Sequence, residues 1–236
     1  MKKNKSIIAI IPARGGSKGI KLKNLRKLNG KSLVDLVGEI VSQLDFVDRA
    51  VISTDHPEIA RVAKLSGLDV PSMRPNNLSG DLISDVEVLT HVLLEVEKLD
   101  NKKYDIILLL PPTSPFRKAE HVLSTVNKLV DGDYDSVITV SETDSKSHPL
   151  KQLVLSGDKV KYYDNRGKKI IARQQLTPVY HRNGAAYSMT RECLLVQKAI
   201  IGKNSSAVII DDELVNIDNK WDLEYAKYLI NNGLVI

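Results

Sequence analysis

The sequence predicts an α/β fold with a doubly wound, mostly parallel sheet. Short β-branched and aliphatic runs alternate with longer amphipathic segments along most of the 236 residues. The run at 106–110 is continuously apolar, as expected of a strand covered on both faces. Regular alternation of strands and helices favours a parallel sheet with helices on both sides, which binds ligands beyond the carboxyl ends of its strands.

The elements are predicted in the following order along the chain. Apolar runs bounded by turn-forming residues predict strands at 7–11, 50–53, 106–110, 136–140 and 207–210. Apolar residues at helical spacing predict helices at 33–44, 57–66, 84–99, 119–130 and 220–231. We expect the loops that follow Ile11, Ser53, Leu110 and Ile210 to share one ligand-binding rim.

The segment 144–182 interrupts this alternation. It is polar, contains "SGDK" and a hairpin-like "YYDNRGKK", and is long for a loop. A surface excursion with short strands is the simple interpretation, and a partner subunit is one surface on which it could pack. We expect a single domain over 1–236 with this segment as an insertion.

The composition indicates in which compartment the protein is expected and which class of partner it would bind. A hydrophobic content of 42% and a charged content of 27% are ordinary for a soluble globular protein. The net charge of +5 favours an anionic partner: nucleic acid, a membrane surface or a phosphorylated small molecule. The single cysteine, Cys193, cannot form an intramolecular disulfide and is best explained as a small buried side chain.

Neither an export signal nor a membrane span is expected. The apolar run at 7–11 is shorter than the core of a signal peptide and is followed at once by Arg14 and Lys18. No later segment approaches the length of a membrane-spanning helix. We therefore expect a cytoplasmic protein that does not bind membranes.

The stretch "PARGGSKGIKLKNL" directly after the first strand predicts an anion-binding loop. Its glycines allow the backbone to turn amide groups toward one point, and Arg14, Lys18 and Lys23 add positive charge. The glycine spacing differs from the dinucleotide-binding pattern, and "NGKS" at 29–32 lacks the earlier glycine of a phosphate-binding P-loop. A solvated turn would not explain why glycines and cations coincide.

Two later segments also belong to the predicted rim. "PPTSPFR" at 111–117 ends a strand with rigid prolines and hydroxyl side chains, which suits a binding wall or a capped turn. In "VNID", the side chains of Asn216 and Asp218 share one face of an extended segment and could hold Mg²⁺ together with substrate phosphates. Asp218 or Asn219 could instead cap the last helix.

Other sites are not favoured. "DGDYD" at 131–135 has metal-binding spacing but is expected at the opposite end of the sheet, where a surface turn explains it better. The five histidines show no paired ligand spacing, so neither zinc nor a Ser-His-Asp triad is indicated. Aromatic residues make up 5% and do not alternate with basic ones, which argues against single-stranded nucleic-acid binding.

Eight motifs follow one another along the chain: "IPARGGSKGIKLKNL", "VISTD", "RPNNLSGDLIS", "PTSPFR", "HPLK", "RQQL", "RNGAAY" and "NIDNKWDLE". In this order they resemble the motifs of bacterial CMP-sialic acid synthetases, the N-acylneuraminate cytidylyltransferases. The resemblance covers nearly the whole chain. It implies a Rossmann-like nucleotidyltransferase in which the anomeric hydroxyl of a nonulosonic acid attacks CTP, giving a CMP-sugar and pyrophosphate with Mg²⁺ as cofactor. The first loop favours sialic, legionaminic or pseudaminic acid over the 8-carbon Kdo.

The resemblance also implies roles for individual residues. Arg14, Lys18 and Asp218 would be catalytic, with Asp218 as the main Mg²⁺ ligand beside Asn216. The CTP-binding residues would be Arg14, Ser17, Lys18, Lys23, Asn24, Arg74 and Ser84. The sugar acid would contact Tyr187 and, from a dimerisation arm at 144–182 of a partner subunit, Lys151 and Arg173, with Arg173 fixing the carboxylate.

Two positions depart from the family pattern. Pro111 stands where family members commonly carry a glutamine that meets the sugar, and Asn216 replaces one aspartate of the metal pair. We therefore expect an altered acceptor pocket and a metal site that depends on Asp218 and the phosphates. The alternatives are another sugar nucleotidyltransferase with a Kdo-type acceptor and a non-catalytic nucleotide-binding homologue. A basic nucleic-acid-binding protein has little beyond net charge in its favour.

Overall fold

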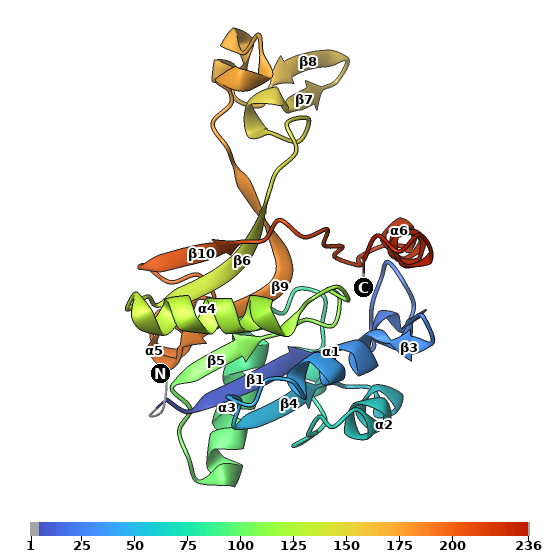
Figure 1. Cartoon of the computed structure of the whole chain (residues 1–236), viewed down its shortest axis with the longest axis vertical. Coiled ribbons are helices and arrows are strands. Elements are labelled where there is room, and N and C mark those ends of the chain that lie inside the picture. The colour runs from blue at the N-terminus through green and yellow to red at the C-terminus, as the bar shows by residue number, and fades with distance from the viewer. Residues whose placement is uncertain (1–4, 236) are drawn as a thin grey trace.

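A six-stranded sheet with helices on both faces forms the body of the computed structural model, which describes residues 5–235 (Figure 1). Residues 1–4 and residue 236 lie outside the described residues. The strands of the sheet, in the spatial order β10-β6-β9-β5-β1-β4, are β10 (Ser205–Ile209), β6 (Ser136–Glu142), β9 (Tyr180–Thr190), β5 (Ile106–Leu109), β1 (Ile7–Pro12) and β4 (Arg49–Ser53).

The sheet is parallel except for one strand. β1 pairs in parallel with β4 and β5, and β10 pairs in parallel with β6, whereas β9 lies antiparallel between β5 and β6. The predicted fold class is confirmed, but the predicted set of strands was wrong because it omitted β9. This strand begins with four polar residues and contains Gly184, so it lacks the β-branched run that marks the others.

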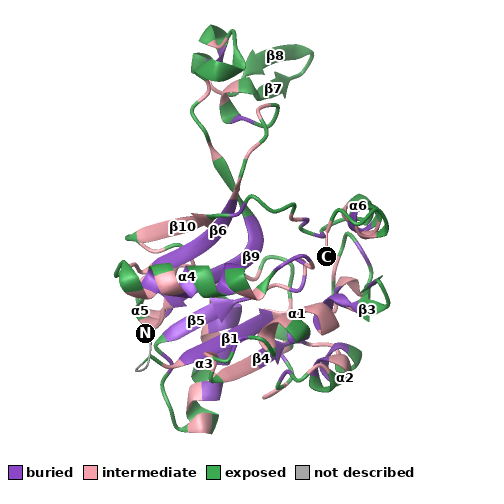
Figure 2. Ribbon diagram, in the orientation of Figure 1, coloured by how far each residue is buried: buried purple, intermediate pink, exposed green. Residues whose placement is uncertain are grey.

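Helices cover both faces of the sheet. The helices α1 (Leu33–Val41), α2 (Pro57–Leu65) and α4 (Ala119–Asp131) contribute to one buried cluster, and α3 (Asp85–Asp100) and α5 (Arg191–Leu195) to the other. The strands between these layers are largely buried (Figure 2). α1 ends three residues before its predicted end, because turns begin at 42–44. Among the described residues, no helix has the length and apolar character needed to cross a membrane.

Side-chain caps fix where the helices next to the rim begin. Ser32 and Ser84 form capping boxes at the start of α1 and α3. Asn219 accepts hydrogen bonds from two backbone N–H groups at the start of α6 (Lys220–Asn231). α6 packs with the small hairpin of β2 (Lys27–Leu28) and β3 (Lys31–Ser32) through a third apolar cluster. The segment that carries Asn216 and Asp218 is thus held between the sheet and α6.

Between Glu142 and Tyr180 the chain leaves the sheet and stands away from it as a separate lobe (Figure 1). We call residues 143–179 the excursion. Its hairpin consists of β7 (Leu153–Ser156) and β8 (Lys159–Tyr162), whose residues are all exposed. The turn lies at Gly157, with φ +63°, in "SGDK". The hairpin therefore lies earlier in the chain than the predicted "YYDNRGKK". Most of that stretch forms the short 3-10 helix Asn165–Lys169 instead.

Candidate active site

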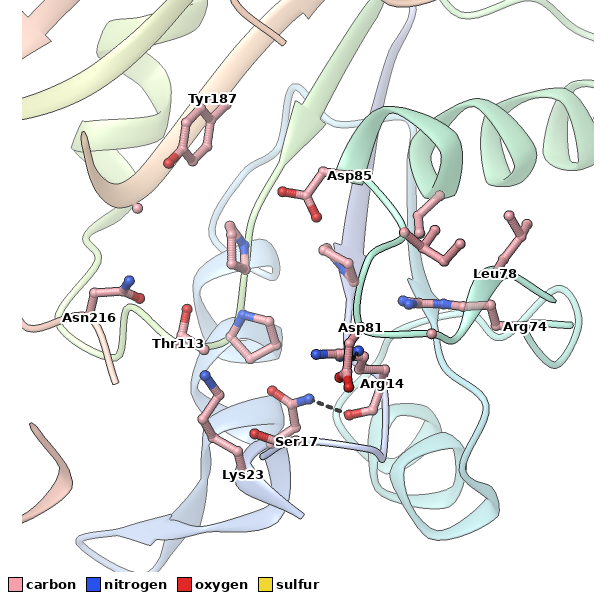
Figure 3. A pocket seen from close by; sticks show the side chains of 18 of the residues that line it. Arg14, Ser17, Lys23, Arg74, Leu78, Asp81, Asp85, Thr113, Tyr187 and Asn216 are labelled. Carbon is pink, nitrogen blue, oxygen red and sulfur yellow. Dashed lines mark hydrogen bonds and ion pairs between the residues drawn. The ribbon is translucent and has the colours of Figure 1, made fainter. Parts of the chain in front are cut away.

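A cleft of about 430 Å³ opens at the carboxyl ends of the parallel strands, where the loops after β1 and β5 meet the segment after β10 (Figure 3). Segments before and within α3 and residues 182–187 of β9 complete its walls. The residues that line it are Pro12, Arg14, Ser17, Lys23, Asn24, Arg74, Leu78, Gly80, Asp81, Ile83, Asp85, Val88, Pro111, Pro112, Thr113, Arg182, Gly184, Tyr187 and Asn216.

The glycine-rich loop after β1 forms one end of the cleft. The backbone N–H of Gly15 donates to Oδ1 of Asp55 at 2.7 Å, which ties the loop to the end of β4. The buried Asn24 donates through Nδ2 to the carbonyl oxygen of Arg14 at 3.0 Å. Arg14 and Ser17 therefore occupy fixed backbone positions, and their side chains face the cleft.

Asp81 neutralises the cations of this loop. Its Oδ1 lies 2.9 Å from an Arg14 guanidinium nitrogen, and its Oδ2 lies 2.7 Å from Nζ of Lys18. The hydrogen bond from Lys18, followed by its charge and the contact with Arg14, lowers the pKa of the Asp81 carboxyl. Lys18 itself is 78% exposed and does not line the cleft. An internal carboxylate thus occupies the position expected for a phosphate group.

A second ion pair lies on the other side of the loop. Nζ of Lys23 lies 2.8 Å from Oδ1 of Asp218, and Nδ2 of Asn216 donates to Oδ2 of Asp218 at 3.1 Å. Gly19 packs directly on the backbone of Asp218, so that a methyl group on Gly19 would overlap the Asp218 carbonyl oxygen. The structure therefore brings together the predicted phosphate-binding loop and the two predicted metal ligands, and Asp218 remains 66% exposed.

Arg74 is the most rigidly held cation of the cleft. Its Nε donates to Oγ of Ser53 at 2.9 Å, and a terminal nitrogen donates to the carbonyl oxygen of Ser53 at 2.7 Å. The side chain is buried, and burial lowers the pKa of Arg74. Because Ser53 ends β4, this contact connects the predicted rim to the segment that precedes α3.

Hydrogen bonds from Arg117 hold the proline-rich loop after β5, which forms one wall of the cleft, against β9. This buried guanidinium donates to the carbonyl oxygens of Pro111 at 2.5 Å and Gly184 at 3.3 Å, and also to that of Ala185. With no carboxylate partner among residues 5–235, burial lowers the pKa of Arg117 to about 9. Oγ of Ser114 donates to the carbonyl oxygen of Asn183 at 3.2 Å. The loop after β5 and the middle of β9 are therefore one rigid wall.

The far end of the cleft contains two charged residues that the sequence analysis did not select, Asp85 and Arg182, beside the predicted Tyr187. In Figure 3, Asp85 and Tyr187 lie at the end opposite Ser17 and Lys23. Asp85 as a whole residue is exposed along the cleft, but the protein atoms around its carboxyl group keep water from that group and raise its pKa. The positive charges of Arg74 and Arg182 oppose this shift without reversing it. Both missed residues adjoin recognised motifs: Asp85 follows Ser84, and Arg182 begins "RNGAAY".

Besides Lys18 and Asp218, three more predicted site residues do not line the cleft. The hydroxyl of Ser84 accepts from the N–H of Glu87 and donates to the Glu87 carboxylate at 2.7 Å, so it serves as the cap of α3. Lys151 and Arg173 lie in the excursion, within or at the start of short 3-10 helices, and are exposed. Their predicted contact with the sugar acid requires a second subunit, which the structure does not contain.

One further cluster has the residue types of a metal site. Ligand atoms of Glu120, His121 and Asp212 lie within 4.8 Å of one another. Nδ1 of His121 accepts from the N–H of Lys118 at 3.2 Å, and Nε2 lies 3.0 Å from Oδ2 of Asp212. The ammonium of Lys118 lies 2.7 Å from the same oxygen. Because both ring nitrogens are engaged, the cluster is best described as an ion-pair network that joins α4 to the segment after β10.

Comparison with known proteins places this geometry in a family. The family model described as cytidylyltransferase matches residues 8–235. The chain is 31% identical to the pseudaminic acid cytidylyltransferase of Campylobacter jejuni, over 94% of this chain and 95% of that protein. It is also 31% identical to the N-acylneuraminate cytidylyltransferase of Escherichia coli, over 93% of this chain and 51% of that longer protein.

A solved structure shows the same fold at lower identity. CMP:2-keto-3-deoxy-manno-octonic acid synthetase, determined in complex with CTP, superposes with a TM-score of 0.71 at 18% identity and covers 97% of this chain and 99% of that one. The matched family model spans nearly the whole chain, including every residue that lines the cleft. The chain belongs to the cytidylyltransferase family and is a nucleotidyltransferase enzyme.

Proposed function

We propose that the enzyme transfers CMP from CTP to the anomeric hydroxyl of a nonulosonic acid, releasing pyrophosphate, and that it requires Mg²⁺. The observation that carries this proposal is the convergence of Arg14, Ser17 and Lys23 with Asn216 and the adjacent Asp218 at one end of the cleft. Relatives named as cytidylyltransferases of pseudaminic acid and N-acylneuraminate support the acceptor class. A reaction that consumes CTP, together with a single buried cysteine, supports a cytoplasmic site of action.

The chemistry needs positive charge because both substrates are anions. At 4 Å and an effective dielectric constant near 20, each pair of like unit charges costs about 4 kcal/mol. The anomeric oxygen attacks the α-phosphorus, the bond from that phosphorus to the bridging oxygen of pyrophosphate breaks, and the hydroxyl proton is lost. Arg14, Lys18 and Lys23 would hold the phosphates in line and stabilise the charge that develops on the leaving group.

The residues at the start of α6 fit a magnesium ion delivered with the nucleotide. The carboxylate of Asp218 and the side-chain oxygen of Asn216 are hard oxygen donors, and Asp218 is open to solvent. The 2.8 Å contact with Lys23 shows that Asp218 already holds a cation next to the phosphate-binding loop. When bound, Mg²⁺ would neutralise phosphate charge and polarise the α-phosphate. With one carboxylate, binding should depend strongly on the phosphates.

We further propose that the excursion docks on a second copy of the chain. Eight lysines and arginines and three aspartates give it a net charge of +5, which equals the charge of the whole chain. Leu155 and Ile171 are 76% and 92% exposed, although they belong to an otherwise ordered lobe. A two-stranded hairpin has little stability of its own, so these apolar side chains need a partner surface. Docking on a homodimer partner would bring Lys151 and Arg173 to that partner's sugar acid.

Pyrophosphate release tests the function directly. Purified enzyme is supplied with CTP and one of Neu5Ac, legionaminic acid, pseudaminic acid or Kdo, and product is identified as CMP-sugar. We expect turnover with one of the nonulosonic acids; turnover with Kdo alone would favour the Kdo-type alternative. CTP binding without turnover on any acid would favour a non-catalytic nucleotide-binding homologue. Salt-sensitive binding to DNA or RNA instead of CTP would favour the nucleic-acid interpretation.

Variants of the same loop test the assigned roles. Arg14→Ala should lower kcat/KM at least 100-fold, because it removes charge at the phosphates, whereas Lys21→Ala, outside the cleft lining, should not. Asp218→Ala should raise the Mg²⁺ concentration needed for half-maximal rate. Unchanged Mg²⁺ dependence would contradict the metal assignment. Mixing Arg14→Ala subunits with Arg173→Ala subunits of lowered activity should raise the activity above the sum of the two separate variants if two chains share each site.

A further inference from the structure

Arg182 differs from the other cations that line the cleft. Arg14 and Lys23 are paired with Asp81 and Asp218, and Arg74 is buried against Ser53. Across residues 5–235, the side chain of Arg182 forms no ion pair within 4.0 Å and no hydrogen bond. A cation that lines a ligand cleft without a partner is available to an anionic ligand.

The strand irregularity in β9 determines which side of the sheet Arg182 occupies. Tyr187 pairs with Ile138 and Arg182 pairs with Val140, with a register shift between the two pairs. Ile138 and Val140 are two residues apart and share one face of β6, so their partners also share that face. Without the irregularity, residues 182 and 187 would lie on opposite faces, because five is an odd number of steps.

This shared face is the one covered by α3. Ile138, Val140 and Tyr187 belong to the buried cluster that includes the apolar face of α3. Asp85, the first residue of α3, therefore lies on the same side of the sheet and lines the same end of the cleft. Its carboxyl group lies more than 4.0 Å from Arg182, since the pair does not qualify as a salt bridge, and both charged groups remain available to a ligand.

The wall beside Arg182 lacks a side-chain donor. Pro111 offers no polar side-chain atom, and its position is fixed by the contact from Arg117 that also holds Gly184. A carboxylate that enters this end of the cleft has two groups available to bind it: the guanidinium of Arg182 and the hydroxyl of Tyr187. The guanidinium can bind a carboxylate through two parallel hydrogen bonds.

We propose that Arg182 binds the carboxylate of the acceptor acid within its own subunit, and that Asp85 accepts hydrogen bonds from the acceptor's hydroxyl or amide groups. This inference rests on the proposed function and deepens it. The carboxylate is then bound by Arg182 of the subunit's own cleft, in place of Arg173 from a partner's excursion. The arrangement makes the far end of the cleft selective for sugar acids over neutral sugars, while the phosphate end selects the nucleotide.

The test uses the acceptor acid and its methyl ester as paired substrates, measured in wild-type enzyme, Arg182→Ala and Arg182→Lys. In wild-type enzyme, we expect the ester to have a KM roughly 10- to 100-fold above that of the acid, the range expected from losing a charged hydrogen-bonded contact. In Arg182→Ala, the KM of the acid should rise by a similar factor and the ratio of ester to acid should fall toward one. Arg182→Lys should restore part of the discrimination. The affinity for CTP, measured by titration calorimetry, should change less than twofold.

Two controls separate this role from a structural one. Arg61→Ala removes the same charge from an exposed position on α2, paired with Glu58, and should leave the ratio of ester to acid unchanged. Thermal unfolding of each variant checks the fold. Three results would each overturn the inference. They are undiminished discrimination in Arg182→Ala, loss of discrimination in Arg173→Ala instead, and a large loss of CTP affinity in Arg182→Ala. If wild-type enzyme used none of the acids, the proposed function would fail first, so the two failures are distinguishable.

Discussion

The contact between Gly19 and Asp218 predicts that one methyl group will inactivate the enzyme. In Gly19→Ala, the new Cβ would overlap the carbonyl oxygen of Asp218, and the backbone atoms on both sides belong to the site. To restore normal contact, the glycine-rich loop and the Asp218 segment must separate by roughly 1 Å, a displacement that can cost on the order of 100-fold in rate. Such overpacking also costs about 1–3 kcal/mol of stability.

Gly16 provides a matched control in the same loop. A Cβ on Gly16 has no atom within 4 Å, and its φ is not in the left-handed region. We therefore expect Gly16→Ala to retain wild-type kcat, and Gly19→Ala to lose about two orders of magnitude in kcat, assayed by pyrophosphate release at saturating CTP and Mg²⁺. Urea unfolding at the assay temperature confirms that both variants are folded. A Gly19→Ala enzyme with kcat within twofold of wild type would refute the argument that this contact sets the distance between loop and metal ligands.

Three other predictions follow from contacts outside this pair. Asp81→Asn removes the carboxylate that occupies the phosphate-binding cations, so the Kd for CTP should fall a few-fold in calorimetry; Glu58→Gln, with the same charge change on α2, should leave it unchanged. Burial opposes ionisation of Glu97, but hydrogen bonds from Arg191 and from the N–H of Tyr104 outweigh it and lower its pKa. Its ionised form therefore stabilises the fold fully above the ordinary value of 4.5, and this contribution is lost as the pH falls through the lowered pKa. The free energies of unfolding of wild type and Glu97→Gln should differ at pH 7 and converge in acid; a constant difference would contradict this. Leu93→Ala, at a fully buried position on α3, should lower the free energy of unfolding by about 2–5 kcal/mol in urea titrations, and a loss below about 1 kcal/mol would mean that the core relaxes around the cavity.

The sequence was most informative where structure is determined locally. The starts of α1 and α3 were predicted to within one residue, because Ser32 and Ser84 occupy cap positions directly before apolar periodic segments. The central parallel strands β1 and β5 were recognised because each is a short buried run. By contrast, β9 is a strand because β5 and β6 pair with it on both sides, and neither neighbour is adjacent in sequence.

The same distinction applies to the site. Arg14, Ser17 and Lys23 lie on one continuous loop, so their grouping could be predicted from spacing. Asp81 and Arg182 line the cleft only because the segment before α3 and the irregular part of β9 are brought to the first loop by the fold. Both residues lie in motifs that carry the family resemblance, but no local pattern in the sequence assigns them to the cleft.

The position of β9 between β5 and β6 has a consequence for how the chain folds during synthesis. β1, β4 and β5 can pair as soon as about half the chain has emerged, but β5 then has an open edge and β6 has no neighbour. The strand that joins the two halves is synthesised only after the whole excursion. Closing this gap requires contacts between residues about 80 positions apart, such as Leu109 with Tyr187, and such long-range pairing is slow. A nascent chain that stalls within the excursion would expose the open edge of β5 and both edges of β6, which makes aggregation at that stage the main hazard for expression of truncated forms.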